Sequence, residues 1–182
     1  ASLSNAAPLR AGKGSAYEGG VRVPLFVAWP GVVKPGSTCD VPVITCDIPA
    51  TILDVTGAGA DPAQPLDGES LAGVLRGGSL DRDALYWHYP HYHPGGATPY
   101  SAIRAGTLRL VHFYEDGRDE LYDLATDPGE QKDLAAARPD ETAALRKKLD
   151  AWLTGVGAQL PTPKAPAGVP QQQPPATSGA TN

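Results

Sequence analysis

The amino-acid sequence predicts an α/β chain: the end of a larger sheet, followed by a small antiparallel sheet that is packed by a C-terminal helix. Three observations carry this prediction. Residues 25–29 are apolar at every position between Pro24 and Pro30, which is typical of a buried, parallel strand. Aromatic or β-branched runs alternate with turn residues between positions 85 and 124, as in an antiparallel meander. A helical pattern with an apolar stripe follows over residues 139–155.

Length and composition bound the possible functions. The chain has 182 residues, enough to bury one core of fair size, and its 21 glycines and 19 prolines indicate many turns. The net charge of -5 leaves no basic field that would attract nucleic acid or an anionic membrane surface. No apolar stretch approaches the ~20 residues needed to span a bilayer. We therefore expect neither a nucleic-acid partner nor a membrane partner.

The first candidate for chemistry is Lys13, which lies between Gly12 and Gly14. The two glycines let the backbone bend tightly and leave the ammonium group on a stiff turn, a geometry that suits an anion. Taken alone, the pattern favours an ordinary surface lysine, because it lacks the spacing of a phosphate-binding loop and no strand precedes it. Glu18 and Arg22 lie four positions apart, and we expect them to form an ion pair that holds this loop.

Two helices are expected between the apolar run and the meander. Asp47 is a good N-cap for a buried helix over residues 48–56, and Gly57 ends it. A polar loop over residues 58–67 then leads to a short helix over residues 70–76. We expect neither helix to carry chemistry.

The meander and its covering helix follow from residue 85 onward. Four strands are expected, at residues 85–89, 101–104, 107–114 and 120–124. The helix begins with Pro139 in its first turn, presents Leu145, Leu149 and Trp152 on one side, and stops at Gly155. The last stretch, residues 161–182, is rich in Pro and Gln and has almost no apolar side chains, so we expect it to be disordered.

Histidines and cysteines raise the question of a metal site or a disulfide. His88, His91 and His93 lie within six residues, but an extended chain points His88 away from the other two, and no carboxylate or Cys lies nearby. We therefore expect no metal site, and interpret these histidines and their neighbouring tyrosines as lining the mouth of a binding pocket. Cys39 and Cys46 are consistent with a disulfide and equally with two thiols.

A long stretch of the sequence resembles a known family. The segments NAPLRAGKGSAYEGGVRVPLFVAWPG, PVITCDIPATILDVTGA, PLDGESL, LYWHYPHY and AIRAGTLRLVHFYEDGRDELYDLATDPGE resemble the last third of the catalytic domain of type I (formylglycine-dependent) sulfatases, the arylsulfatase family. The resemblance covers residues 5–163. It implies the C-terminal part of an alkaline-phosphatase-like fold, and hydrolysis of a sulfate ester. The opening residues contain no initiator Met, so we expect a fragment that begins within a domain.

The resemblance also implies a division of the chain. Residues 1–80 would be the C-terminal part of the catalytic α/β domain, residues 81–160 a C-terminal antiparallel-sheet subdomain with its helix, and residues 161–182 the tail. The upstream part of the same catalytic domain would be the partner of this segment. The family further suggests a periplasmic or secreted protein.

Residue roles carried over from the family are few. Lys13 would contact the substrate sulfate, as a catalytic and substrate-binding residue, and His88 would bind substrate in its Trp-His-Tyr-Pro context. Calcium and formylglycine are implied for the full-length enzyme, but no metal ligand is expected here. Cys39 and Cys46 have a proline one place too late for the formylglycine motif C/S-x-P-x-R, and no Arg follows.

Three functions therefore stay open from the sequence. The first is the C-terminal part of a sulfatase that acts on a sulfated small molecule or carbohydrate, with the fragment inactive on its own because nucleophile and metal ligands lie upstream. The second is a non-catalytic carbohydrate-binding or packing module derived from a sulfatase. The third is a phosphate-ester hydrolase of the same superfamily.

Overall fold

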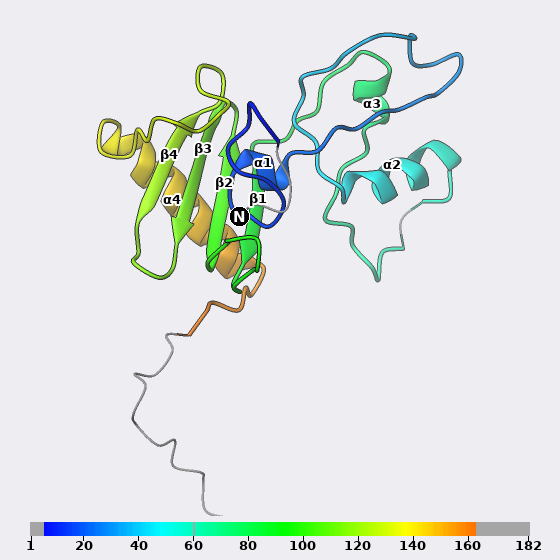
Figure 1. Cartoon of the computed structure of the whole chain (residues 1–182). Helices are drawn as coiled ribbons and strands as arrows, with labels where there is room; N and C mark the ends of the chain where they lie inside the picture. The colour runs from blue at the N-terminus through cyan, green and yellow to red at the C-terminus, as the bar shows by residue number, and fades with distance from the viewer. Residues whose placement is uncertain (1–5, 60, 163–182) are drawn as a thin grey trace, which may run out of the picture.

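The strands of the chain form one antiparallel sheet. The computed structural model describes residues 6–59 and 61–162 (Figure 1). The strands are β1 (Leu85–Tyr89), β2 (Tyr100–Ala105), β3 (Leu108–Phe113) and β4 (Asp119–Asp123), in the sheet order β1-β2-β3-β4. Each strand thus pairs antiparallel with the next one along the chain. The predicted meander is confirmed, with strand ends that shift by at most one residue.

Three of the four helices in the described residues lie where the sequence predicts them, whereas the first, at residues 18–21, was not predicted. The helices are α1 (Glu18–Val21), α2 (Asp47–Thr56), α3 (Ala72–Leu75) and α4 (Pro139–Gly155). Helix α4 crosses the back of the sheet in Figure 1, whereas the N-terminal segment with α1 lies in front of it. Helices α2 and α3 contact each other beside the sheet. The α/β class, the small antiparallel sheet and its C-terminal helix are therefore confirmed.

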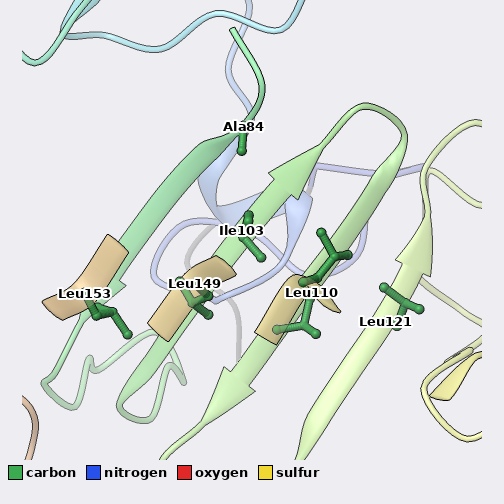
Figure 2. Close-up of a cluster of buried hydrophobic side chains, with 7 residues drawn as sticks. Ala84, Ile103, Leu110, Leu121, Leu149 and Leu153 are labelled. Atoms are coloured by element: carbon green, nitrogen blue, oxygen red, sulfur yellow. The ribbon is translucent and has the colours of Figure 1, made fainter. Parts of the chain in front are cut away.

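The main core lies between the sheet and α4. Figure 2 shows Ile103, Leu110 and Leu121 from three neighbouring strands facing Leu149 and Leu153 of the helix. Burial of one such side chain contributes about 1.5–3 kcal/mol. At the edge of this core, the rings of Tyr86 and Trp152 stack with their centroids 4.8 Å apart. These contacts hold α4 against one face of the sheet.

A second, smaller cluster covers the opposite face of the sheet. It joins Ala16 and Ala97 to four residues of β2 and β3, which are Tyr100, Ala102, Val111 and Phe113. Alternate residues of a strand point to opposite faces, so the same strands supply both clusters. Ala16 belongs to this second cluster, so the cluster packs the N-terminal segment against the sheet.

The predicted strand at residues 25–29 is not formed. This stretch is extended but is not assigned to a sheet, and the exposed fractions of Leu25 and Phe26 are 46% and 91%. A strand needs a neighbour whose backbone groups complete the ladder, and no strand of the described residues pairs with this stretch. The expected end of a larger sheet is thus absent from the described part of the chain, and its apolar side chains face outward.

Asp47 does not act as the predicted N-cap. Cys46 occupies that position, while the buried Asp47 carboxylate accepts hydrogen bonds from the backbone N–H groups of Ile44 and Glu69, at 2.8 Å and 3.0 Å, and pairs with Arg82. Burial raises the pKa of Asp47, but Arg82 and the two N–H groups outweigh it and hold the pKa below its usual value. The residue ties α2 to two later segments.

Three further expectations can be placed. Cys39 is exposed, Cys46 is half-buried, and neither is in a disulfide. Residues 163–182 of the predicted disordered tail lie outside the described residues. Within the described ranges, no helix has the length and apolar character that crossing a membrane would require.

Candidate functional site

Lys13 projects from a tight turn on the sheet face opposite α4. The Ser15 N–H donates to the Gly12 carbonyl over 3.1 Å, and Gly14 has φ +82°, a left-handed conformation that favours glycine. Gly12 is buried, whereas the Lys13 side chain is exposed. The sequence therefore places an ammonium group at the surface while fixing the backbone that carries it.

A buried ionic cluster anchors the turn from its C-terminal side. Arg109 of β3, which is fully buried, donates to the Ala16 carbonyl over 2.5 Å and to the Glu130 carboxylate. Glu130 is also fully buried and accepts from the Glu18 N–H over 2.6 Å. Burial raises the pKa of Glu130, and the charge of Arg109 opposes this rise. Residues 16–18 are thus tied to both a strand and a loop.

The predicted ion pair at the start of α1 is present. Arg22 NH1 lies 3.8 Å from Glu18 Oε2, and Arg104 NH1 lies 3.8 Å from the same oxygen. The Glu18 side chain is only 2% exposed, whereas that of Arg22 is 55% exposed. The ion pair therefore helps to hold the turn, as expected. Arg104 of β2 is an additional partner of Glu18.

Arg10 anchors the turn from its N-terminal side. Its guanidinium group donates to Tyr122 Oη over 2.8 Å and to the Glu130 carbonyl over 2.9 Å, and lies 3.7 Å from the centroid of the Tyr17 ring. Tyr17 Oη in turn donates to Glu120 over 2.9 Å. Burial and the nearby Glu120 carboxylate raise the pKa of Tyr17 to about 12. Arg10 before Lys13 and Tyr17 after it are therefore both bonded to β4.

The loop between β1 and β2 packs directly on the Lys13 turn. The Ala97 N–H donates to the Gly14 carbonyl over 2.9 Å, and the His93 N–H donates to the Ala97 carbonyl over 2.9 Å. A Cβ atom at Gly14 would lie 2.1 Å from His93 Nδ1, and one at Gly95 would lie 2.6 Å from the Lys13 carbonyl oxygen. Glycine at both positions is what allows this close approach. The contact joins segments that are far apart in the sequence.

His88 lies on the other face of the sheet. Its Nδ1 is 2.8 Å from Ser101 Oγ, and its Nε2 is 2.9 Å from the carbonyl oxygen of Gln159, beyond the end of α4. Its ring also meets that of Tyr114 edge to face. The structure therefore does not bring His88 and Lys13 together. His93 is the histidine beside the Lys13 turn, and the adjoining Pro-Gly-Gly was the signal in the sequence for a close backbone contact.

The described residues do not fit a metal cofactor. Within residues 6–59 and 61–162, no group of three or more His, Cys, Asp or Glu side chains is placed to hold an ion. The buried carboxylates Glu18, Asp47 and Glu130 instead face arginines. What these residues offer is an exposed ammonium group on a turn whose backbone packs against an imidazole.

Comparison with known proteins assigns the chain to a family. The family model described as N-sulphoglucosamine sulphohydrolase, C-terminal, matches residues 12–159. A sulfatase of Formosa agariphila is 37% identical over 190 aligned positions, which cover 90% of this chain and 34% of that protein. Arylsulfatase A of Homo sapiens is 33% identical over 192 positions, which cover 87% of this chain and 37% of that protein.

A solved structure agrees with these relatives. The protein in complex with its substrate D-glucosamine-2-N,6-O-disulfate matches with a TM-score of 0.62 and 28% identity, over 73% of this chain and 28% of that chain. The chain spans 34% and 37% of the length of these two curated relatives. The match to the family model includes both the Lys13 turn and the loop that packs on it. The chain therefore belongs to the sulfatase family, to the part described as the C-terminal region of N-sulphoglucosamine sulphohydrolase.

Proposed function

We propose that this chain is the part of a sulfatase that contributes Lys13 to the hydrolysis of sulfate esters. The observation that carries the proposal is the exposed Lys13 on a turn that is bonded on both sides, in a segment that belongs to the sulfatase family. The ammonium group donates hydrogen bonds to the sulfate oxygens and stabilises the negative charge that grows on the leaving oxygen. Removing a preorganised donor of this kind lowers the rate about 100-fold or more.

The other residues of the turn contribute by holding it still. Arg10, Arg109 and Glu130 fix the backbone on either side of Lys13, so no binding energy is used to order it. Calcium and formylglycine, which the family uses, find neither ligands nor motif among the described residues. The role of Lys13 is accordingly argued from its charge and position alone.

We propose a sulfated carbohydrate as the substrate. The support is the related structure bound to a sulfated glucosamine, and the half-exposed aromatic rings next to the Lys13 turn. Tyr89 meets His91 and His93 edge to face, with ring centroids 5.6 Å and 6.3 Å away. Aromatic rings beside a few directed polar groups suit the apolar faces and hydroxyls of a sugar. His88 lies on the sheet face away from Lys13, so we propose it as a binding residue only for a substrate that extends to that face.

We further propose that residues 1–80 complete the catalytic domain and that residues 81–160 form a subdomain. Val23 and Phe26 are 73% and 91% exposed, and Ile52 of α2 is 54% exposed. Such apolar surface is typical of an interface. The occupant that we propose is the remaining part of the catalytic domain, which lies upstream in the relatives. A periplasmic or secreted location follows from the same resemblance.

The experiment measures sulfate release by the full-length protein and its variants. We expect Lys13→Ala to lower kcat/KM for a sulfated monosaccharide by at least about 100-fold, with unchanged thermal unfolding, because an exposed side chain on a glycine turn buries little. Lys34→Ala is the matched control, since Lys34 is also an exposed lysine beside a glycine-containing turn. An equal effect of both substitutions would contradict the proposal.

Other outcomes identify the rival functions. Release of phosphate but not sulfate would make the protein a phosphate-ester hydrolase of the same superfamily. Binding of the sulfated sugar without release would make it a binding module. We also propose that residues 1–182 alone release no sulfate. Sulfate release by residues 1–182 would overturn this view if Lys13→Ala abolished it.

A further inference from the structure

His93 occupies a defined position beside Lys13. The point that a Cβ of Gly95 would occupy lies 2.6 Å from the Lys13 carbonyl oxygen and 2.9 Å from His93 Nδ1. The imidazole also packs against Gly14, where an added Cβ would lie 2.4 Å from His93 Cε1. The ring of His93 and the backbone of the Lys13 turn are therefore in direct contact.

The hydrogen bonding of the loop sets the tautomer of this imidazole. The Gly95 N–H donates to His93 Nδ1 over 2.9 Å, so Nδ1 is an acceptor and carries no proton. The neutral ring must then carry its proton on Nε2. Within the part of the chain that the structure describes, Nε2 has no hydrogen-bond partner, and the residue is half-buried. His93 thus offers one uncharged N–H donor beside the backbone of the turn that carries Lys13.

The surroundings of His93 favour the alcohol half of a sulfate ester over the sulfate half. Lys13 already supplies a positive charge for the anion, and a neutral imidazole adds none. Tyr89 lies edge to face with His93, and the same loop continues outward into the exposed Tyr92. A directed neutral donor among aromatic rings matches a sugar hydroxyl, which has no charge to attract.

We propose that His93 is a specificity-determining residue that donates a hydrogen bond from Nε2 to a hydroxyl of the sulfated sugar. This inference rests on the proposed sulfatase function. It assigns the selection of the alcohol to the β1–β2 loop and the binding of the sulfate to Lys13. The two segments form one site because Gly14 and Gly95 let them touch.

Two substitutions of His93 separate this role from support of the loop. In His93→Asn, the side-chain oxygen can take the place of Nδ1 and accept from the Gly95 N–H, while the Nε2 donor is lost. In His93→Gln, the amide group can reach the place of Nε2, while the bond to Gly95 is lost. A substrate role predicts the larger kinetic effect for Asn, whereas a purely structural role predicts it for Gln.

The assay uses the full-length protein with N-acetylglucosamine 6-sulfate as substrate and inorganic sulfate as an inhibitor that has no alcohol half. We expect His93→Asn to raise KM for the sugar about 5- to 10-fold with little change in kcat, the effect of one lost neutral hydrogen bond. The inhibition constant of inorganic sulfate should stay within about twofold of wild type. His93→Gln should retain a lower KM than His93→Asn.

The possible results are distinct. Equal changes in KM and in the inhibition constant would mean that His93 acts on the sulfate or the turn, and would overturn the inference. An unchanged KM in His93→Asn would overturn it as well. Because both constants come from the same sample, partial unfolding of a variant does not alter them. A wild-type protein that releases no sulfate from any sulfated sugar would instead refute the proposed function itself.

Discussion

The close contact between Gly14 and His93 yields a quantitative prediction. Gly14→Ala places a methyl group where His93 Nδ1 and Cε1 would be 2.1 Å and 2.4 Å away, and the Gly95 Cα 3.1 Å away. The two distances to the imidazole are too short for a real Cβ atom, and the third is tighter than most. The imidazole must turn away and give up its bond to the Gly95 N–H, or the whole loop must move.

Gly14→Ala destabilises the protein both through this collision and through backbone strain, and a control substitution separates the two effects. Gly14 has φ +82°, so Ala there also pays for a left-handed conformation, about 1–2 kcal/mol. Gly117, in the turn between β3 and β4, has φ +71° and open space around it, so Gly117→Ala introduces the backbone strain without a collision. We expect Gly14→Ala to cost about 1–3 kcal/mol more than Gly117→Ala, the usual penalty for overpacking.

Urea unfolding of the two variants and wild type measures this difference. In the full-length protein, Gly14→Ala should also lower sulfate release, because the turn that carries Lys13 is displaced, whereas Gly117→Ala should leave it unchanged. Equal free energies of unfolding for the two variants would refute the contact between the turn and the loop.

Two other predictions concern the buried charges. Glu130→Gln should destabilise the chain by about 3 kcal/mol in urea unfolding, because one amide cannot accept from both Arg109 and the Glu18 N–H, whereas the exposed Glu141→Gln should change stability by less than about 0.5 kcal/mol. A loss below about 1 kcal/mol for Glu130→Gln would show that the cluster is not buried as described. Asp47 has a folded pKa below its ordinary 3.8, so its stabilisation is present above about pH 4 and is lost as the pH falls through the folded value. The stability difference between wild type and Asp47→Asn should therefore shrink below pH 4, and a constant difference from pH 7 to pH 2 would contradict the pairing with Arg82.

Local patterns predicted most of the elements. The alternation of residues 85–124 predicted the strand ends to within one residue, and Pro139 and Gly155 marked both ends of α4. The strand at residues 25–29 failed for a physical reason. An apolar run predicts that its side chains are buried, but it does not identify the segment that buries them. Among the described residues, no strand pairs with this run.

The site was predictable only in part. Lys13 could be singled out because its turn chemistry is local and because it lies in a segment that resembles the sulfatase family. His88 and His93 differ by tertiary contacts: one packs toward the end of α4 and the other on the Lys13 turn. The buried Arg109 and Glu130 are far apart in the sequence and gave no local signal, since their pairing exists only once the sheet has formed.

A crystal structure of the full-length protein with a sulfated monosaccharide bound would show directly whether Lys13 contacts the sulfate group. We expect a sulfate oxygen about 2.7–3.2 Å from Lys13 Nζ, with the sugar ring lying toward the β1–β2 loop. A sulfate group bound elsewhere, with the Lys13 side chain in solvent, would contradict this expectation.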